Sequence, residues 1–275
     1  MDTLSLGIVS DEISTDFRQA VQLGVSWGIS HFELRCLNTG RVPFVQQTEL
    51  DDVLRVVKER EISITALSPG VFKHPLSKRD ELERECVEAL PMTIAMARQF
   101  GAPLIIVFGF HREPGDQKEQ YAYAVELMRR AARVAEKEGV KLAIENEPGF
   151  WCDTGANTSR FIRDVASPVL GANWDPCNAY GTNEAPFPDG YLAIRSFIFN
   201  VHVKDTKQGA LVQCVPIGEG ALDWGGQIAA LLRDKVVRHV TIETHCLPLI
   251  ENSWRNVEAL RRLLSELART REHIP

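Results

Sequence analysis

The chain lacks the features that mark several common classes of protein. No stretch of its 275 residues reaches the roughly 18 uninterrupted apolar residues that a membrane span requires. Its six cysteines are scattered and form no C-x-x-C pair, which favours reduced thiols over disulfides or a thiolate metal site. It has no G-x-G-x-x-G after an early strand and no P-loop, and these absences disfavour an open nucleotide-binding sheet.

Positive charge is also in short supply. Lysine and arginine total 31 against 37 aspartates and glutamates, for a net charge of −6. This balance argues against a nucleic-acid or membrane partner held by bulk electrostatics. The opening MDTLSLGIVSDEIS has neither the basic region nor the apolar core of a secretion signal. We therefore expect a cytoplasmic globular protein.

Short apolar runs alternate with segments of helical periodicity along the whole chain. The apolar runs predicted as strands are 4–9, 29–34, 62–67, 104–108, 141–145, 169–174, 197–203 and 237–243. Residues 50–60, 117–138 and 254–268 show the clearest helical periodicity. Helices are expected to end at Gly24, Gly101 and Gly139, and Pro91 should kink or split the third helix. Residues 178–197 are predicted to be mostly loop, with one short helix at the end.

Eight strand–helix units fit the length of the chain. They take about 34 residues each, close to the ~30 of a βαβ unit. Strands that are apolar on both faces belong in a parallel sheet covered by helices. We predict one α/β domain over residues 1–275, a single (β/α)₈ TIM barrel, with an open doubly wound sheet as the rival.

Four polar side chains close four successive apolar runs in the second half of the chain. They are Glu145 in LAIENEP, Asp175 in LGANWDP, His202 in FNVHVKD and Glu243 in VTIETH. The active sites of such barrels lie at the carboxyl ends of the strands, so these side chains should converge. Three carboxylates and one imidazole suit one divalent cation, Mn²⁺ first, with Mg²⁺, Co²⁺ and Zn²⁺ as alternatives.

The two-residue period of a strand predicts a second layer of polar groups at the rim. If Glu145, His202 and Glu243 point inward, the residues two positions later do so as well. These residues are Glu147, Lys204 and His245. Taken singly, a strand-end glutamate is more often part of a rim salt bridge, and a lone histidine is more often a core residue. Four such residues on adjacent strands favour the metal site.

These motifs resemble the xylose isomerase-like TIM-barrel superfamily, and more narrowly its sugar phosphate isomerase/epimerase branch. The resemblance rests on I-E-N, D-P-x-N, H-V-K-D and I-E-T at the four strand ends. It extends to I-V-S-D-E-I-S, H-F-E-L-R and the segment G-E-G-A-L-D-W at 218–224. It implies that Glu145, Asp175, His202 and Glu243 bind one divalent metal. It also implies that the two glutamates act as acid and base on a sugar or related hydroxy-ketone, in carbohydrate metabolism. The epimerase members often carry a histidine where this chain has Asn178, so an amide contact would replace an imidazole contact at that position.

Further positions are candidates for substrate binding, each beside a plain structural alternative. His111 follows the fourth strand and can meet substrate hydroxyls or be a solvated loop residue. Glu33 ends the second strand, and it faces either the site or a helix. Trp151 can cover the substrate or serve packing. Lys204 can meet an anionic group or pair with Asp205. Glu147 and Asn178 complete the predicted substrate-binding set.

The sequence is consistent with several substrates and functions. No basic cluster marks strand ends seven and eight as a phosphate site, which favours an unphosphorylated sugar or keto acid. A dehydratase of the inosose or dehydroshikimate type would use the same ligands, and a non-catalytic binding barrel is a further alternative. An abasic-site endonuclease is disfavoured, because it needs more histidine ligands and a basic DNA-binding face. Exposed barrel helices often pair, so a homodimer is also an alternative.

Overall fold

Eight parallel strands close into a barrel in the computed structural model, which describes residues 4–209 and 212–272. Around the barrel the order is β1-β12-β9-β8-β7-β6-β5-β2, and β1 pairs with both β12 and β2 to close the ring. The barrel strands are β1 (Ser5–Val9), β2 (His31–Leu34), β5 (Ser63–Leu67), β6 (Leu104–Phe108), β7 (Lys141–Glu145), β8 (Leu170–Trp174), β9 (Ile198–Val203) and β12 (His239–Ile242). The predicted (β/α)₈ barrel is therefore confirmed, and each strand lies where an apolar run predicted one.

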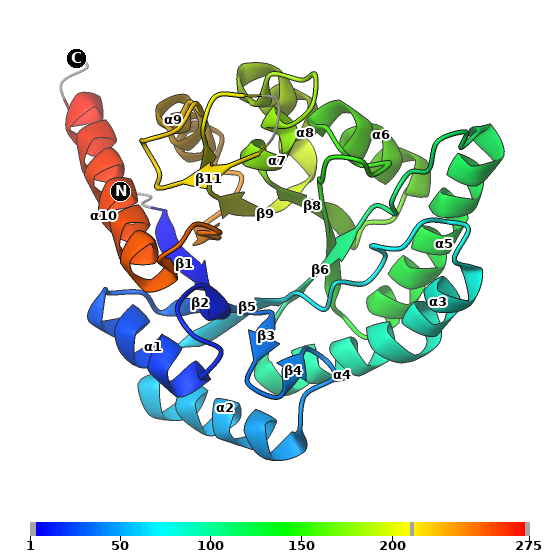
Figure 1. The fold of residues 1–275 in the computed structure, drawn as a ribbon, viewed down its shortest axis with the longest axis horizontal. Helices are drawn as coiled ribbons and strands as arrows, with labels where there is room; N and C mark the ends of the chain where they lie inside the picture. Colours follow the sequence, from blue (N-terminus) through cyan, green and yellow to red (C-terminus); the bar gives the residue numbers. More distant parts are fainter. Residues whose placement is uncertain (1–3, 210–211, 273–275) are drawn as a thin grey trace.

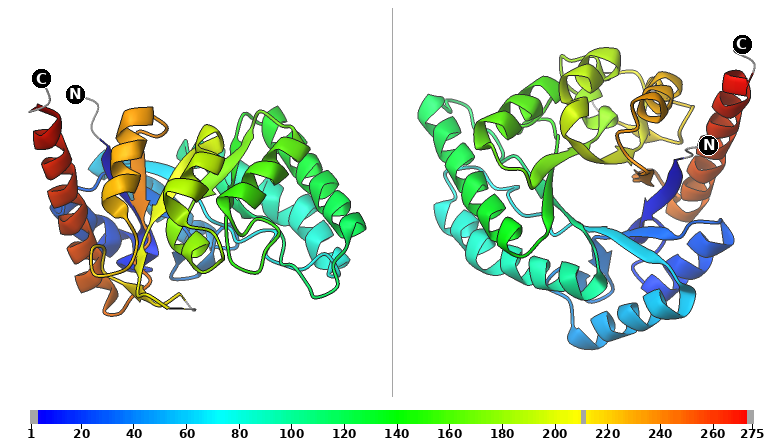
Figure 2. Two further views of the ribbon diagram at one scale, coloured as in Figure 1. Left: turned by 90° about the horizontal axis from the view of Figure 1, so that it is seen from above. Right: turned by 180° about the vertical axis from the view of Figure 1, so that it is seen from behind.

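Helices surround the strands as an outer ring (Figure 1). They are α1 (Phe17–Ser26), α2 (Gln47–Arg60), α3 (Arg79–Arg84), α4 (Leu90–Phe100), α5 (Lys118–Lys137), α6 (Gly155–Val165), α7 (Pro176–Tyr180), α8 (Tyr191–Ile194), α9 (Trp224–Asp234) and α10 (Leu249–Glu272). A 3₁₀ turn, η1 (Ser10–Glu12), follows β1. The small hairpins β3 (Cys36–Leu37) with β4 (Gly40–Arg41), and β10 (Asp205–Thr206) with β11 (Cys214–Val215), lie outside the barrel sheet. In the left view of Figure 2 the yellow segment containing β10 and β11 extends beyond one end of the strands.

The third helical segment is split as Pro91 predicted. A π-helical stretch, η2 (Glu85–Ala89), interrupts the α-helical hydrogen bonding between α3 and α4, although helical backbone angles continue through it. Pro91 is the second residue of α4, directly after this stretch, which accommodates the missing N–H of the proline. Residues 178–197 hold more helix than expected. The segment predicted as loop includes the end of α7. It also includes a π turn, η3 (Pro186–Gly190), then α8 and a 3₁₀ turn, η4 (Arg195–Phe197). Pro186 is the first residue of η3, and this turn is irregular, because Phe187 within it has extended backbone angles, φ −137° and ψ 133°.

Two of the three glycine helix ends are confirmed. Gly101 and Gly139 have φ of 67° and 71° just after α4 and α5. Gly24 instead lies inside α1, and the left-handed residue is Gly28, with φ of 71°. A Cβ on Gly24 would lie 2.6 Å from the ring of Phe32, so this glycine lets α1 pack closely against β2.

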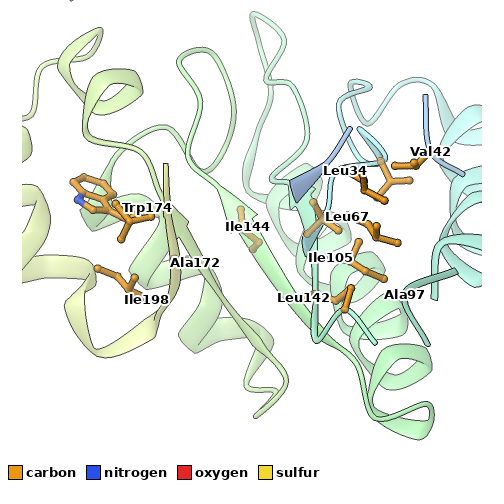
Figure 3. Packing of buried hydrophobic residues seen from close by; sticks show 14 of the residues in the cluster. Leu34, Val42, Leu67, Ala97, Ile105, Leu142, Ile144, Ala172, Trp174 and Ile198 are labelled. Atoms are coloured by element: carbon orange, nitrogen blue, oxygen red, sulfur yellow. The ribbon is translucent and has the colours of Figure 1, made fainter. Parts of the chain in front are cut away.

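Alternate residues of β6 and β7 belong to two different clusters. Figure 3 shows Ile105, Leu142 and Ile144 in the large cluster between the strands and the helices. Their neighbours in sequence, among them Ile106 and Ala143, form a separate small cluster inside the barrel. Glu145, two residues after Ala143, therefore points into the barrel at the carboxyl end of β7.

Candidate metal centre

Four buried side chains meet at the carboxyl ends of neighbouring strands. Glu145 ends β7, Asp175 follows β8, His202 is the penultimate residue of β9, and Glu243 follows β12. One ligand atom from each lies within 4.8 Å of the others, and no residue of the four is more than 6% exposed. The four strand ends that the sequence singled out do converge on one point.

The donor atoms fit a metal ion. His202 Nε2 lies 3.0 Å from Glu33 Oε2, so the neutral ring can donate its proton to that carboxylate. His202 Nδ1 then faces Glu145 Oε1 and Glu243 Oε2, at 3.4 Å from each, and has no hydrogen-bond partner among the described residues. When the ring gives up its second proton, Nδ1 presents a lone pair between two carboxylates, and this is the arrangement that a divalent cation satisfies.

Asp175 is positioned by its backbone and by helix capping. As the N-cap of α7 it accepts the backbone N–H of Asn178 at Oδ1 (3.0 Å), which leaves Oδ2 for the cluster. The side chain of Asn146 accepts the Asp175 N–H and donates to the Asp175 carbonyl, both at 2.8 Å. This paired contact holds the end of β8 against the end of β7.

A buried lysine and a half-buried arginine neutralise the carboxylates. Lys204 Nζ lies 2.7 Å from both Asp175 Oδ2 and Glu243 Oε2. Arg35 donates to Glu243 Oε1 at 2.7 Å and also pairs with Glu12 and Asp11, at 2.6 and 3.0 Å. Both oxygens of Glu243 are therefore held by cations.

Burial and the neighbouring charges set the ionisation of the cluster. Burial disfavours the imidazolium of His202, but the carboxylates of Glu33, Glu243 and Glu145 outweigh it and raise its pKa well above the usual value. Burial likewise disfavours the carboxylate of Glu243, yet the nearby cations hold its pKa well below the usual range. For Asp175, burial and the other carboxylates together outweigh Lys204 and raise the pKa.

A cavity of about 350 Å³ opens above this cluster, a size that suits a small ligand. Of the predicted second layer, Glu147, Lys204 and His245 all line it, and so does Asn178. The complete lining is Arg35, Arg41, Ser68, Lys73, Phe108, Glu145, Glu147, Asn178, His202, Lys204, Val212, Cys214, Glu243 and His245. Asn178 donates to the carbonyl of Asn146 at 2.9 Å and lies 3.4 Å from Glu145 Oε1.

Three predicted substrate contacts lie outside this lining. Glu33 is fully buried beneath the cavity, where it contacts His202 and accepts a hydrogen bond from Ser68. His111 is exposed and packs edge-on against Phe150. Trp151 packs against Tyr121 and lies beneath the guanidinium of Arg112. This placement makes Glu33 a hydrogen-bond partner of the candidate ligand His202 and gives the other two packing contacts in place of cavity contacts.

The sequence interpretation missed several charged residues at the mouth. Arg41, on the β3–β4 hairpin, and Lys73, in the loop after β5, line the cavity. Glu12 contacts Arg35 and accepts the backbone N–H of His245 at 2.8 Å. Glu12 lies within the D-E-I-S motif, so that motif could have indicated a residue of the site. Arg41 lies in a hairpin and Lys73 in a loop, and no sequence motif marks either of them.

The chain belongs to the xylose isomerase-like TIM-barrel family, whose model matches residues 21–267. Among solved structures it is similar to an L-ribulose 3-epimerase, with 18% identity, 99% of this chain and 100% of that chain covered, and a TM-score of 0.79. It is also similar to the probable 3-DHS dehydratase AsbF of Bacillus anthracis, with 17% identity, coverage of 94% and 98%, and a TM-score of 0.77. A third similar structure is the IOLI protein with a bound zinc atom, with 17% identity, coverage of 96% and 99%, and a TM-score of 0.78.

At these identities the likeness to solved structures establishes the fold. No curated protein sequence gives a significant match. All six cysteines are free thiols, as predicted. Within residues 4–209 and 212–272, no helix combines the length and apolar composition that crossing a membrane requires.

Proposed function

We propose that this protein is a divalent-metal-dependent isomerase or epimerase of a sugar or related hydroxy-ketone. The observation that carries the proposal is the buried set of Glu145, Asp175, His202 and Glu243, with His202 Nδ1 left without a partner between two carboxylates. These four residues would hold the metal, which we propose is Mn²⁺. Bound there, the metal would act as a Lewis acid that stabilises negative charge developing on the oxygens of the substrate.

Glu145 and Glu243 are the proposed acid and base. They come from β7 and β12, and His202 lies between them on β9 in the strand order. A substrate carbon above the cluster would thus have one carboxylate on each side. One glutamate removes the proton next to the carbonyl, and an enediolate forms. Return of the proton to the other face of that carbon gives the epimer, and return to the adjacent carbon gives the isomer.

The surroundings of the two glutamates support this division of roles. Arg35 and Lys204 hold both oxygens of Glu243, which keeps that carboxylate ionised and oriented. Glu145 has longer contacts, because the amide of Asn178 and Nδ1 of His202 each lie 3.4 Å from its Oε1. Asp175 and His202 are proposed to act as ligands only.

Epimerases and a dehydratase share this fold, so the experiment must separate proton transfer from loss of water. Purified protein is loaded with Mn²⁺ and incubated in D₂O with a panel of ketoses and keto acids. Deuterium at a single carbon, read by NMR, is the expected result for enediolate chemistry. Loss of a hydroxyl from the product would identify the dehydratase alternative instead.

Variants of the two glutamates test the assignment. Glu145→Gln and Glu243→Gln should each slow deuterium incorporation by about 10²–10⁴-fold, the usual contribution of a general acid or base. Glu136→Gln, an exposed glutamate on α5, is the matched control and should exchange at the wild-type rate. Wild-type exchange in either glutamine variant would contradict the two-glutamate mechanism.

A further inference from the structure

The cavity has walls of different character. The proposed metal ligands come from β7, β8, β9 and β12, which are contiguous in the strand order. The remaining wall is formed by the segments after β2 and β5 and by the end of β6. This wall contributes Arg41, Ser68, Lys73 and Phe108. A substrate that reaches from the ligands across the cavity meets cationic side chains there.

Most cations that line the cavity are already paired with carboxylates. Arg35 is bound by Asp11, Glu12 and Glu243, and Lys204 by Asp175 and Glu243. Lys73 lies 3.0 Å from Glu147 and 3.9 Å from the centre of the Phe108 ring. These ion pairs leave little charge for a ligand.

Arg41 differs from the other cations. Its Nε donates to the carbonyl of Ser68 at 2.9 Å, and among the residues that the structure describes no carboxylate pairs with its guanidinium. The side chain is half-buried and lines the cavity. A partly desolvated guanidinium whose terminal nitrogens have no anion retains donors suited to a planar carboxylate or a phosphate.

The position of Arg41 is well determined by its surroundings. It pairs with Cys36 in the β3–β4 hairpin, and the turn of that hairpin is tied to α2 because Glu49 accepts the backbone N–H groups of Asn38 and Thr39. The guanidinium lies over Gly70, where an added Cβ would be 3.0 Å from Cζ and from Nε. The absence of a side chain at Gly70 thus leaves room for the arginine.

We infer that the substrate carries an anionic group, a carboxylate or a phosphate, which Arg41 binds at the side of the cavity away from the metal ligands. This inference rests on the proposed function, because it assigns the two ends of one substrate. The carbon that exchanges its proton lies at Glu145 and Glu243, and the anionic end lies at Arg41. A neutral ketose would leave the guanidinium without a partner.

Binding of two simple anions tests the inference without turnover. Metal-loaded wild type, Arg41→Gln and Arg41→Lys are titrated with inorganic phosphate and with glycolate by calorimetry. We expect Arg41→Gln to bind at least one probe about tenfold or more weakly, as for loss of a charge-assisted hydrogen bond, and Arg41→Lys to fall between. The probe that responds identifies the anionic group. The bound metal attracts each anion equally in the wild type and in both variants, so any difference between them reports on Arg41.

Arg55→Gln is the matched control, because it removes one arginine charge from the exposed face of α2. It should bind both probes as the wild type does, and melting curves verify that every variant is folded. The inference is overturned if neither probe binds the wild type, if Arg41→Gln binds both as tightly, or if Arg55→Gln weakens binding equally. Deuterium exchange with neutral ketoses that is indifferent to Arg41→Gln would sink the inference and leave the proposed function standing. No exchange with any hydroxy-ketone would sink the proposed function instead.

Discussion

The candidate metal ligands stand on β7, β8, β9 and β12, whereas the segments after β2 and β5 supply the cations Arg35, Arg41 and Lys73. The first half of the mouth concentrates carboxylates on adjacent strands, and Lys204 pairs with two of them. Residues of the second half contact the candidate ligands of the first half across the barrel. Arg35 holds Glu243, and Glu33 on β2 reaches His202 on β9. One half can hold a metal, and the other orients and balances it.

Removal of a ligand should have the largest effect on this arrangement. Asp175→Asn retains the N-cap oxygen for Asn178 but replaces an anionic ligand with an amide. We expect metal affinity to fall by more than the ~10–100-fold that the loss of an outer partner costs. Metal analysis after dialysis, with a melting curve as the check on folding, measures this. Full metal occupancy in the variant would remove Asp175 from the ligand set.

Glu33→Gln tests the contribution of the opposite half. The amide cannot accept the Nε2–H of His202 as strongly as the carboxylate does, so the imidazole becomes a poorer and less well oriented ligand. We expect metal affinity to fall by about 10–100-fold, less than for Asp175→Asn. Calorimetric titration of the metal gives both values. If Glu33→Gln lowers metal affinity as much as Asp175→Asn does, Glu33 contributes as much as a direct ligand and is more than a partner of His202.

The smallest predicted effect is the dependence of metal binding on pH. The surrounding carboxylates raise the pKa of His202, so the metal-free protein carries a proton that the metal must displace. Because proton and metal compete, affinity should fall as the pH drops below that raised pKa, by about tenfold per unit. Titrations in buffers of different ionisation enthalpy count the released proton. Glu33→Gln should shift the profile to lower pH because it removes a carboxylate that raises this pKa, and an unchanged profile would contradict that role.

Much of the fold could be predicted because each barrel unit is a local pattern. The run 104–108 is apolar on both faces and is bounded by helical segments, which is the pattern that a parallel strand requires. The segment after Tyr180 was harder to predict, because its short turns depend on contacts with distant elements. One such contact is the hydrogen bond from Gln227 to the carbonyl of Pro186.

The candidate ligands could be predicted for a related reason. Each ends a strand, and parallel strands in a barrel bring their carboxyl ends to one face, so position along the strand implies proximity in space. Glu33 also ends a strand, but its role could not be assigned. Glu33 lies beneath the cavity, where its carboxylate contacts His202 from β9. The sequence does not show this contact, because β2 and β9 are far apart in the chain.

By itself the sequence determined the eight units, the inward period of the strands and the four residues at the strand ends. These follow from short-range periodicity and from a fold whose strand ends share one face. The tertiary structure alone decided which cations meet those residues. Arg41 lies on a hairpin, and its guanidinium reaches the cavity over Gly70, which belongs to another loop. Glu33 contacts His202, which is 169 positions away in the chain. Such contacts have no local pattern, because they arise only when the barrel closes.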